Sequence, residues 1–104
     1  MSLVNITSEN IDQYFNSDQP LILDFWAPWC GPCMQFLPTF EKLSEEYPDV
    51  IFGKINVVDC EELVKRFKIR TVPKVCIFIN QEMKDENFGL MDSEQLKSFI
   101  DKIL

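Results

Sequence analysis

The 104-residue sequence contains no histidine, only three glycines, and ten basic residues against seventeen acidic ones. Without histidine, a zinc site would need two pairs of cysteines at ligand spacing. The formal net charge of -7 makes nucleic acid and anionic membranes poor partners and favours proteins with basic docking surfaces. Apolar residues never run for the roughly eighteen positions of a membrane helix, so we expect neither a membrane span nor a signal peptide.

The composition is that of a folded globule, because 46% of the residues are hydrophobic and nine are phenylalanine. The length is sufficient for one core without disulfide support, and no repeat, linker or low-complexity segment is visible. We therefore expect a single domain over residues 1–104. With no targeting segment in view, the expected compartment is the cytoplasm, where thiols are kept reduced.

The segment Trp29-Cys30-Gly31-Pro32-Cys33 places two thiols three positions apart, where a strand-like run meets a helix-like one. A thiolate attacks only when it is ionised and reachable, and a helix start favours both through free N–H groups and the positive end of the dipole. Cys30 is therefore the candidate nucleophile. Pro32 fits the first turn and leaves the N–H of Cys33 free to face the Cys30 sulfur, which makes Cys33 the candidate resolving thiol.

Other interpretations of this pair are half of a zinc site, a small structural disulfide, or two unrelated buried thiols. A bridge across so short a loop stabilises a protein by only about 2 kcal/mol. Cys60 and Cys76 are not spaced as a second ligand pair, so we expect no metal. Cys60 is expected at a helix start, as an inert thiol or, if it is exposed there, as a candidate for regulatory oxidation or an intermolecular bridge, and Cys76 is expected in the core.

Strands and helices alternate along the chain, which indicates an α/β fold with parallel central strands and a final antiparallel hairpin. The expected strands are Leu3–Ile6, Leu21–Trp26, Val50–Val57, Val75–Ile79 and Asn87–Leu90. The expected helices are a short one capped by Thr7 or Ser8, a long one over Pro32–Tyr47, one capped by Asp59, and a last one with the capping box Asp92 and Gln95.

Asp24 lies inside the apolar run Leu21–Trp26, which is typical of a strand covered on both faces. A carboxyl group buried there is hard to ionise, so its pKa is expected to rise toward neutrality, unless the strand end is frayed and solvated. Lys54 on the neighbouring strand is at a comparable depth and is a candidate charge partner, or else a surface lysine whose stem covers apolar area.

The chain resembles the thioredoxin family along essentially its whole length. The resemblance is carried by the block Asp24-Phe25-Trp26-Ala27-Pro28-Trp29-Cys30-Gly31-Pro32-Cys33, by Pro38, by Lys54 before Ile55-Asn56, by Val72-Pro73, and by Gly89. It implies a thioredoxin fold, with a central mixed sheet flanked by helices. It also implies a protein-disulfide reductase that serves cellular redox homeostasis.

By this resemblance, Cys30 attacks the target disulfide, Cys33 resolves the mixed disulfide, and Asp24 accepts the proton of Cys33 with Lys54 tuning it. Pro73 would be a cis-proline packed against the thiols. Substrate contacts would come from Trp29, Gly31, Pro32, Val72, Pro73 and Gly89. The backbone of Val72 would bond to an extended substrate, as in strand addition.

The Gly31-Pro32 pair between the cysteines resembles the reducing branch of the family. The implied electron donor is an NADPH-dependent flavoprotein, thioredoxin reductase, with protein disulfides as targets, no cofactor of the chain's own, and a monomeric state. An adaptor subunit that binds partners without turnover is the alternative. Met34 replaces the usual basic residue after the second cysteine, and Lys74 is expected to restore positive potential or to select acidic targets. The turn at Asn80–Glu82 lacks the usual glycine.

Overall fold

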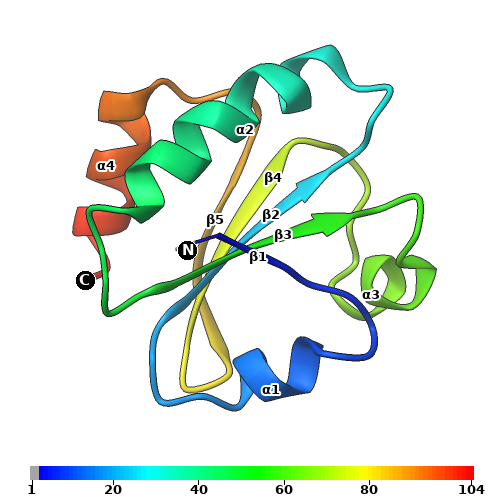
Figure 1. Cartoon of the computed structure of the whole chain (residues 1–104), viewed down its shortest axis with the longest axis horizontal. Helices are drawn as coiled ribbons and strands as arrows, with labels where there is room; N and C mark the ends of the chain where they lie inside the picture. Colours follow the sequence, from blue (N-terminus) through cyan, green and yellow to red (C-terminus); the bar gives the residue numbers. More distant parts are fainter. Residues whose placement is uncertain (1–2) are drawn as a thin grey trace.

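The computed structural model describes residues 3–104, which form a five-stranded sheet in the order β1-β3-β2-β4-β5 (Figure 1). The strands are β1 (Leu3–Asn5), β2 (Leu21–Trp26), β3 (Ile51–Asn56), β4 (Lys74–Ile79) and β5 (Glu82–Phe88). The helices are α1 (Ile11–Phe15), α2 (Gly31–Ser44), α3 (Glu61–Arg66) and α4 (Ser93–Asp101). None of the helices in this described range is long and apolar enough to cross a membrane.

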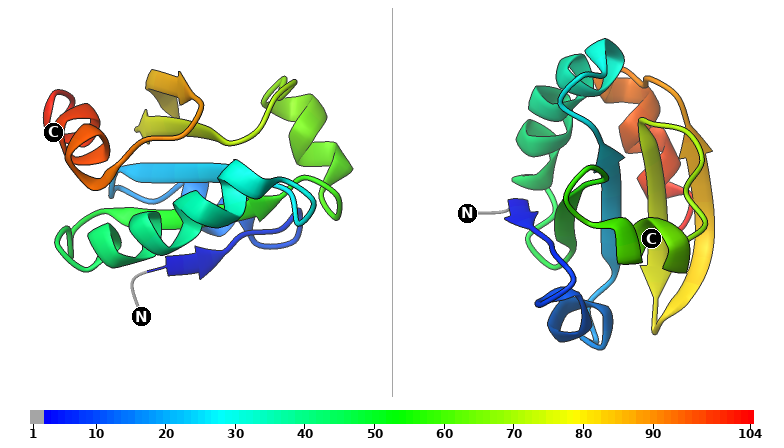
Figure 2. Two further views of the ribbon diagram at one scale, coloured as in Figure 1. Left: turned by 90° about the horizontal axis from the view of Figure 1, so that it is seen from above. Right: turned by 90° about the vertical axis from the view of Figure 1, so that its right-hand side faces the viewer.

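Strand β2 lies at the centre of the sheet and has the bounds expected from its apolar run. Helices α2 and α4 cover one face of the sheet, and α1 and α3 cover the other (Figures 1 and 2). Ile22 packs into the cluster that contains Phe36 and Phe40 of α2, whereas Leu23 and Phe25 pack into the cluster on the opposite face. Alternate β2 side chains therefore enter two separate cores, which is why the strand is apolar except at Asp24.

The parallel pairing expected of the central strands is confirmed for β2 and β3 but not for β2 and β4, and the mixed sheet implied by the family resemblance is present. Strand β2 is parallel to β3 but antiparallel to β4, so the sheet is mixed. The six residues of α3 span about 9 Å, whereas a six-residue strand spans about 20 Å. Because α3 is too short to return the chain along the sheet, β4 starts at the edge where β3 ends.

The predicted hairpin between β4 and β5 is present, but β5 begins at Glu82 and not at Asn87. Asn80 and Gln81 have φ angles of 52° and 70°, so two residues without glycine make the left-handed turn that a tight hairpin requires. Strand β5 is mostly exposed, which explains its polar sequence and why that sequence alone indicates a connection.

The capping box of α4 is confirmed. Asp92 accepts a hydrogen bond from the N–H of Gln95 at 2.8 Å, and the Gln95 side chain accepts one from the N–H of Asp92 at 2.9 Å. These two bonds satisfy donors that the start of a helix otherwise leaves free.

The other two predicted caps are wrong. Helix α3 begins after Cys60, and the carboxylate of Asp59 accepts a bond from Asn56 at 3.3 Å instead of capping the helix. Helix α1 begins after Asn10, whose side-chain oxygen accepts from the N–H of Thr7 at 2.8 Å. Short polar side chains close to a helix start have several local partners, so the sequence alone does not determine which of them acts as the cap.

Candidate active site around Cys30 and Cys33

The two cysteines are joined in a disulfide at the start of α2, with their Cα atoms 5.2 Å apart. The chain leaves β2 at Trp26, and Cys30 then occupies the position immediately before the helix. The N–H of Cys33 donates to the Cys30 sulfur at 3.2 Å, with Pro32 in the first helical turn. The contact expected between the Cys33 N–H and the Cys30 sulfur is therefore present.

The two sulfur-bearing residues differ in accessibility. Cys33 is fully buried, Cys30 is 6% exposed, and the neighbouring Trp29 is 73% exposed. An incoming disulfide therefore reaches Cys30 first, while Cys33 is shielded behind it. This asymmetry suits a pair in which one thiol attacks and the other waits.

The loop before β4 lies against the sulfur pair. The Val72-Pro73 peptide bond is cis, and the Cys30 sulfur is 3.9 Å from the carbonyl oxygen of Val72. Gly89 has a φ angle of +107° and donates its N–H to the carbonyl of Pro73 at 2.9 Å. A Cβ at Gly89 would meet no atom within 4 Å, so the backbone conformation and not a lack of space requires glycine there.

Asp24 is fully buried, and neither of its carboxyl oxygens has a hydrogen-bond partner within the described part of the chain. Burial raises the pKa of Asp24 to about 7, and the positive charge of Lys54 opposes that rise in part. The predicted elevation is confirmed, and a frayed, solvated strand end is excluded. At neutral pH this carboxyl group is divided between its proton-accepting and proton-donating forms.

Lys54 lies directly opposite Asp24 in the parallel β2–β3 register and is half-buried. Its ammonium nitrogen is 5.7 Å from the centre of the Trp26 ring, which is a cation–π distance. The Trp26 indole N–H is buried without a partner in residues 3–104. Lys54 therefore influences Asp24 through space while its head group is held by an aromatic ring.

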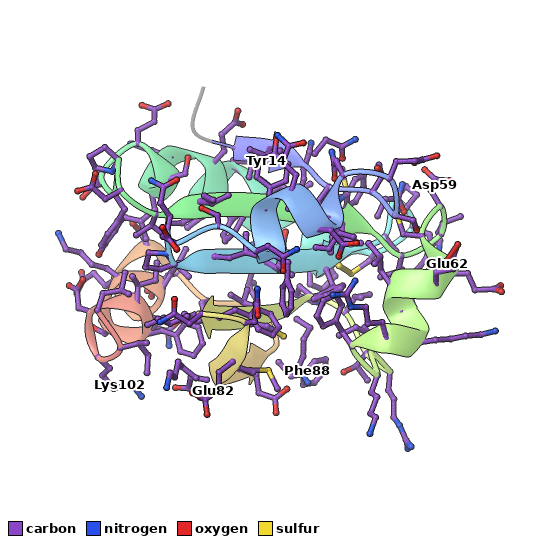
Figure 3. All side chains as sticks on the ribbon, turned by 90° about the horizontal axis from the view of Figure 1, so that it is seen from below. Tyr14, Asp59, Glu62, Glu82, Phe88 and Lys102 are labelled. Atoms are coloured by element: carbon purple, nitrogen blue, oxygen red, sulfur yellow. A yellow bond between two sulfur atoms is a disulfide. The ribbon has the colours of Figure 1, made fainter. Side chains whose placement is uncertain are left out.

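A groove of about 440 Å³ opens beside the sulfur pair. Its walls are mostly apolar, and its lining residues are Trp29, Val57, Val64, Ile69, Arg70, Thr71, Val72 and Phe88. Phe88 lies at the end of β5 nearer α3, whereas Glu82 and Lys102 lie toward the opposite end of the molecule (Figure 3). Because Val72 belongs to the lining, the groove begins at the backbone that contacts Cys30.

The remaining cysteines lie outside this site. Cys60 is buried, so the exposed alternative is wrong, and burial with the nearby negative charge of Asp59 raises its pKa. Cys76 is buried as expected, and burial raises its pKa to about 12. Across residues 3–104, no three His, Cys, Asp or Glu side chains are grouped as a metal site.

Met34 and Lys74 are the two residues that depart from the family pattern near the site. Met34 is 46% exposed in the first turn of α2, so an uncharged side chain stands on the surface where the family usually has a basic one. The Lys74 ammonium group is 2.7 Å from a carboxylate oxygen of Glu86, which offsets the positive potential expected of Lys74. Arg70, which lines the groove, supplies positive charge there instead. Sequence reasoning did not select Arg70 as a site residue, and the only feature that could have indicated it is its position just before Val72-Pro73.

The sequence model of the Thioredoxin family matches residues 2–102. The chain belongs to the thioredoxin family. It is 35% identical over 106 residues to a thioredoxin of Porphyra purpurea, covering all of this chain and 99% of that protein. It is 42% identical over 80 residues to a putative thioredoxin 2 of Streptomyces coelicolor, covering 77% of this chain and 60% of that protein.

The solved structure of the Malassezia sympodialis thioredoxin superposes on the chain with a TM-score of 0.88 at 31% identity. The match covers 97% of this chain and 90% of that one. Together with the bridged Cys30–Cys33 pair, this membership makes the chain a thiol-disulfide oxidoreductase that works by dithiol/disulfide exchange.

Proposed function

We propose that this thioredoxin-family chain is a protein-disulfide reductase, acting in the cytoplasm as a monomer of one domain over residues 1–104. The observation that carries the proposal is the sulfur pair at the start of α2, where the N–H of Cys33 points at the Cys30 sulfur. An N–H at the positive end of a 14-residue helix stabilises negative charge on that sulfur, and a thiolate is the attacking species.

In the first step, the reduced Cys30 thiolate attacks one sulfur of a target disulfide. A bond forms between Cys30 and that sulfur, the target S–S bond breaks, and the second target sulfur leaves as a thiolate that takes a proton from water. The greater accessibility of Cys30 assigns it this step.

In the second step, Cys33 loses its proton and attacks the Cys30 sulfur. The Cys30–Cys33 bond forms, the bond to the target breaks, and the target sulfur leaves as a thiolate that takes a proton from water, so the target disulfide has gained two electrons in all. We assign Asp24 as the acceptor of the Cys33 proton, because its pKa near 7 suits proton transfer at neutral pH. Lys54 acts as a positioning residue that stabilises the ionised form of Asp24.

The target segment is proposed to lie along the cis-Val72-Pro73 loop. The backbone of Val72 adjoins the attacked sulfur, and backbone bonding tolerates many target sequences. Trp29, Gly31 and Pro32 border it on one side, and Pro73 and Gly89 on the other. The open space above Gly31 and Gly89 leaves room for the segment to approach.

The oxidised pair must regain two electrons after each turnover. We propose that they come from an NADPH-dependent flavoprotein, thioredoxin reductase, and that the cycle maintains cellular redox homeostasis. The net charge of -7 favours a donor with a basic docking surface.

Reduction of insulin by a dithiol in the presence of the protein tests the proposal. We expect Cys30→Ser to lower the protein-dependent rate by about three orders of magnitude, because the nucleophile of a covalent mechanism is removed. A matched Cys76→Ala variant, which changes a buried thiol outside the site, should remain within about twofold of the wild type. A wild-type rate no faster than that of Cys30→Ser would overturn the proposal.

Covalent trapping separates a reductase from an adaptor without turnover. Cys33→Ser retains the attacking thiol but lacks the resolving one, so it should accumulate mixed disulfides that reductant releases. An adaptor would retain its partners without any such bond.

A further inference from the structure

Arg70 is the one charged residue among those lining the groove beside the sulfur pair. Trp29, Val57, Val64, Ile69 and Phe88 provide apolar walls, and no carboxylate belongs to the lining. Arg70 is exposed, and within residues 3–104 it makes neither an ion pair nor a side-chain hydrogen bond. Its five donors are therefore available to a bound partner.

The other basic residue near the cis-proline does not compete for this role. Lys74 is largely buried and pairs with Glu86 at 2.7 Å. A carboxylate that approached Lys74 would have to displace Glu86, whereas one that approached Arg70 would meet an unpaired guanidinium group. A guanidinium also binds a carboxylate through two parallel hydrogen bonds, which an ammonium group does not.

On these observations we propose that the groove is a specificity subsite for target segments that carry an acidic side chain close to the attacked cysteine. The inference rests on the proposed reductase function. Arg70 precedes Val72 by two positions, and Val72 adjoins the Cys30 sulfur. An extended segment lying along this loop therefore brings to Arg70 a side chain about two residues from the cysteine. The neighbouring apolar side chain of the segment packs between Trp29 and Phe88.

The acidic preference is local and opposes the field of the whole protein. A net charge of -7 repels acidic partners at long range, but that field is screened beyond about 8 Å at physiological ionic strength. A direct contact with Arg70 is shorter than this distance. Overall charge and local contact are therefore expected to select different features: a basic surface on the partner as a whole, and an acidic residue beside its disulfide.

Two disulfide-linked peptides test the subsite. They are identical except that one carries Glu and the other Gln at the positions two residues before and after the cysteine. We expect the wild type to reduce the Glu peptide with a kcat/KM about two- to fivefold higher than the Gln peptide, as an exposed ion pair allows. The ratio should fall toward one in Arg70→Gln and as salt is raised to about 0.5 M.

Lys68→Gln is the matched control. It removes the same charge from a residue that lies two positions before Arg70 and does not line the groove. This variant should retain the wild-type ratio. The subsite is contradicted by equal rates on the two peptides, by a preference for the Gln peptide, or by an Arg70→Gln ratio equal to that of the wild type. Failure of the wild type to reduce either peptide would overturn the proposed reductase function itself.

Discussion

Cys30 and Cys60 both occupy the position before a helix, and both are nearly buried, yet the helix N–H groups, the sulfur partner and the charges around them differ. The Cys30 sulfur accepts the N–H of Cys33 and bonds to a second cysteine. The Cys60 sulfur caps no N–H of α3, and its S–H donates to the carbonyl oxygen of Ile6 at 3.9 Å. Burial raises the pKa of Cys60 and outweighs a backbone hydrogen bond from Ser8 that lowers it. Asp59 and Glu9 add negative charge that disfavours a Cys60 thiolate.

The helices that follow these two cysteines also differ. Helix α2 has fourteen residues with Pro32 in its first turn, whereas α3 has six and begins with Glu61 and Glu62. Two carboxylates in the first turn of a short helix offset the positive potential that the helix dipole would otherwise create at the sulfur. The comparison teaches that the position before a helix is not sufficient to favour a thiolate: the N–H groups of that helix must face the sulfur, and nearby anions must be absent.

The largest expected effect concerns Asp24, the buried carboxyl group that we assign to the Cys30–Cys33 site. Its pKa rises from 3.8 to about 7 on folding, so the folded state retains a proton that the unfolded chain releases between those values. Stability is therefore lost as pH rises from about 4 to 7, by about 4 kcal/mol in total, and stays lost above pH 7. Asp24→Asn removes this loss.

Urea unfolding of the wild type and Asp24→Asn at several pH values measures the difference. The two free energies of unfolding should be similar near pH 4 and should separate by up to about 4 kcal/mol in favour of the variant at pH 8. A difference that stayed constant with pH would show that folding does not raise the pKa of Asp24. Release of the target from the mixed disulfide should be slower in the same variant.

A smaller effect separates the helix starts at Asp92 and Asp59. Asp92→Ala removes the bond to the N–H of Gln95 and should lower the free energy of unfolding by about 1 kcal/mol. Asp59→Ala removes only the contact with Asn56 and should change it by less than about 0.5 kcal/mol. Equal losses in the two variants would restore Asp59 as the cap of α3.

The smallest expected effect is on the Cys60 thiol. Burial is the main cause of its raised pKa and Asp59 the next, so Asp59→Asn should lower that pKa while leaving it above its ordinary value. Thiolate absorbance during a pH titration, in a Cys30→Ser, Cys33→Ser background, measures the change. Asp18→Asn removes an exposed charge elsewhere and should leave the titration unchanged. A Cys60 pKa below its ordinary value in Asp59→Asn would contradict the dominance of burial.

Local patterns predicted the parts of this structure that local chemistry decides. Strand β2 has the expected bounds. A strand buried on both faces is apolar from end to end apart from Asp24 in its interior, so the apolar run marks where the strand begins and ends. The capping box at Asp92 and the Cys33 N–H contact depend on residues three positions apart, within the reach of one helical turn. The cis bond before Pro73 was expected only from the family resemblance.

What the sequence did not predict depends on long-range packing. The direction of β4 follows from the length of α3 relative to the strands, and the burial of Cys60 follows from Ile6, fifty-four positions earlier in the chain. Strand β5 was missed in part because an exposed edge strand needs no apolar alternation. The ion pair between Lys74 and Glu86 joins β4 to β5, and the sequence does not predict the register of this hairpin.

Competition between thiols for a limiting alkylating agent tests most directly whether local surroundings make Cys30 the reactive cysteine. The reduced wild-type protein is treated with iodoacetamide at pH 7, and the modified residues are located by mass spectrometry while circular dichroism confirms that it stays folded. We predict that Cys30 reacts first, at least about a hundredfold faster than Cys60 or Cys76. Modification of Cys60 in the folded protein as fast as that of Cys30 would contradict the account.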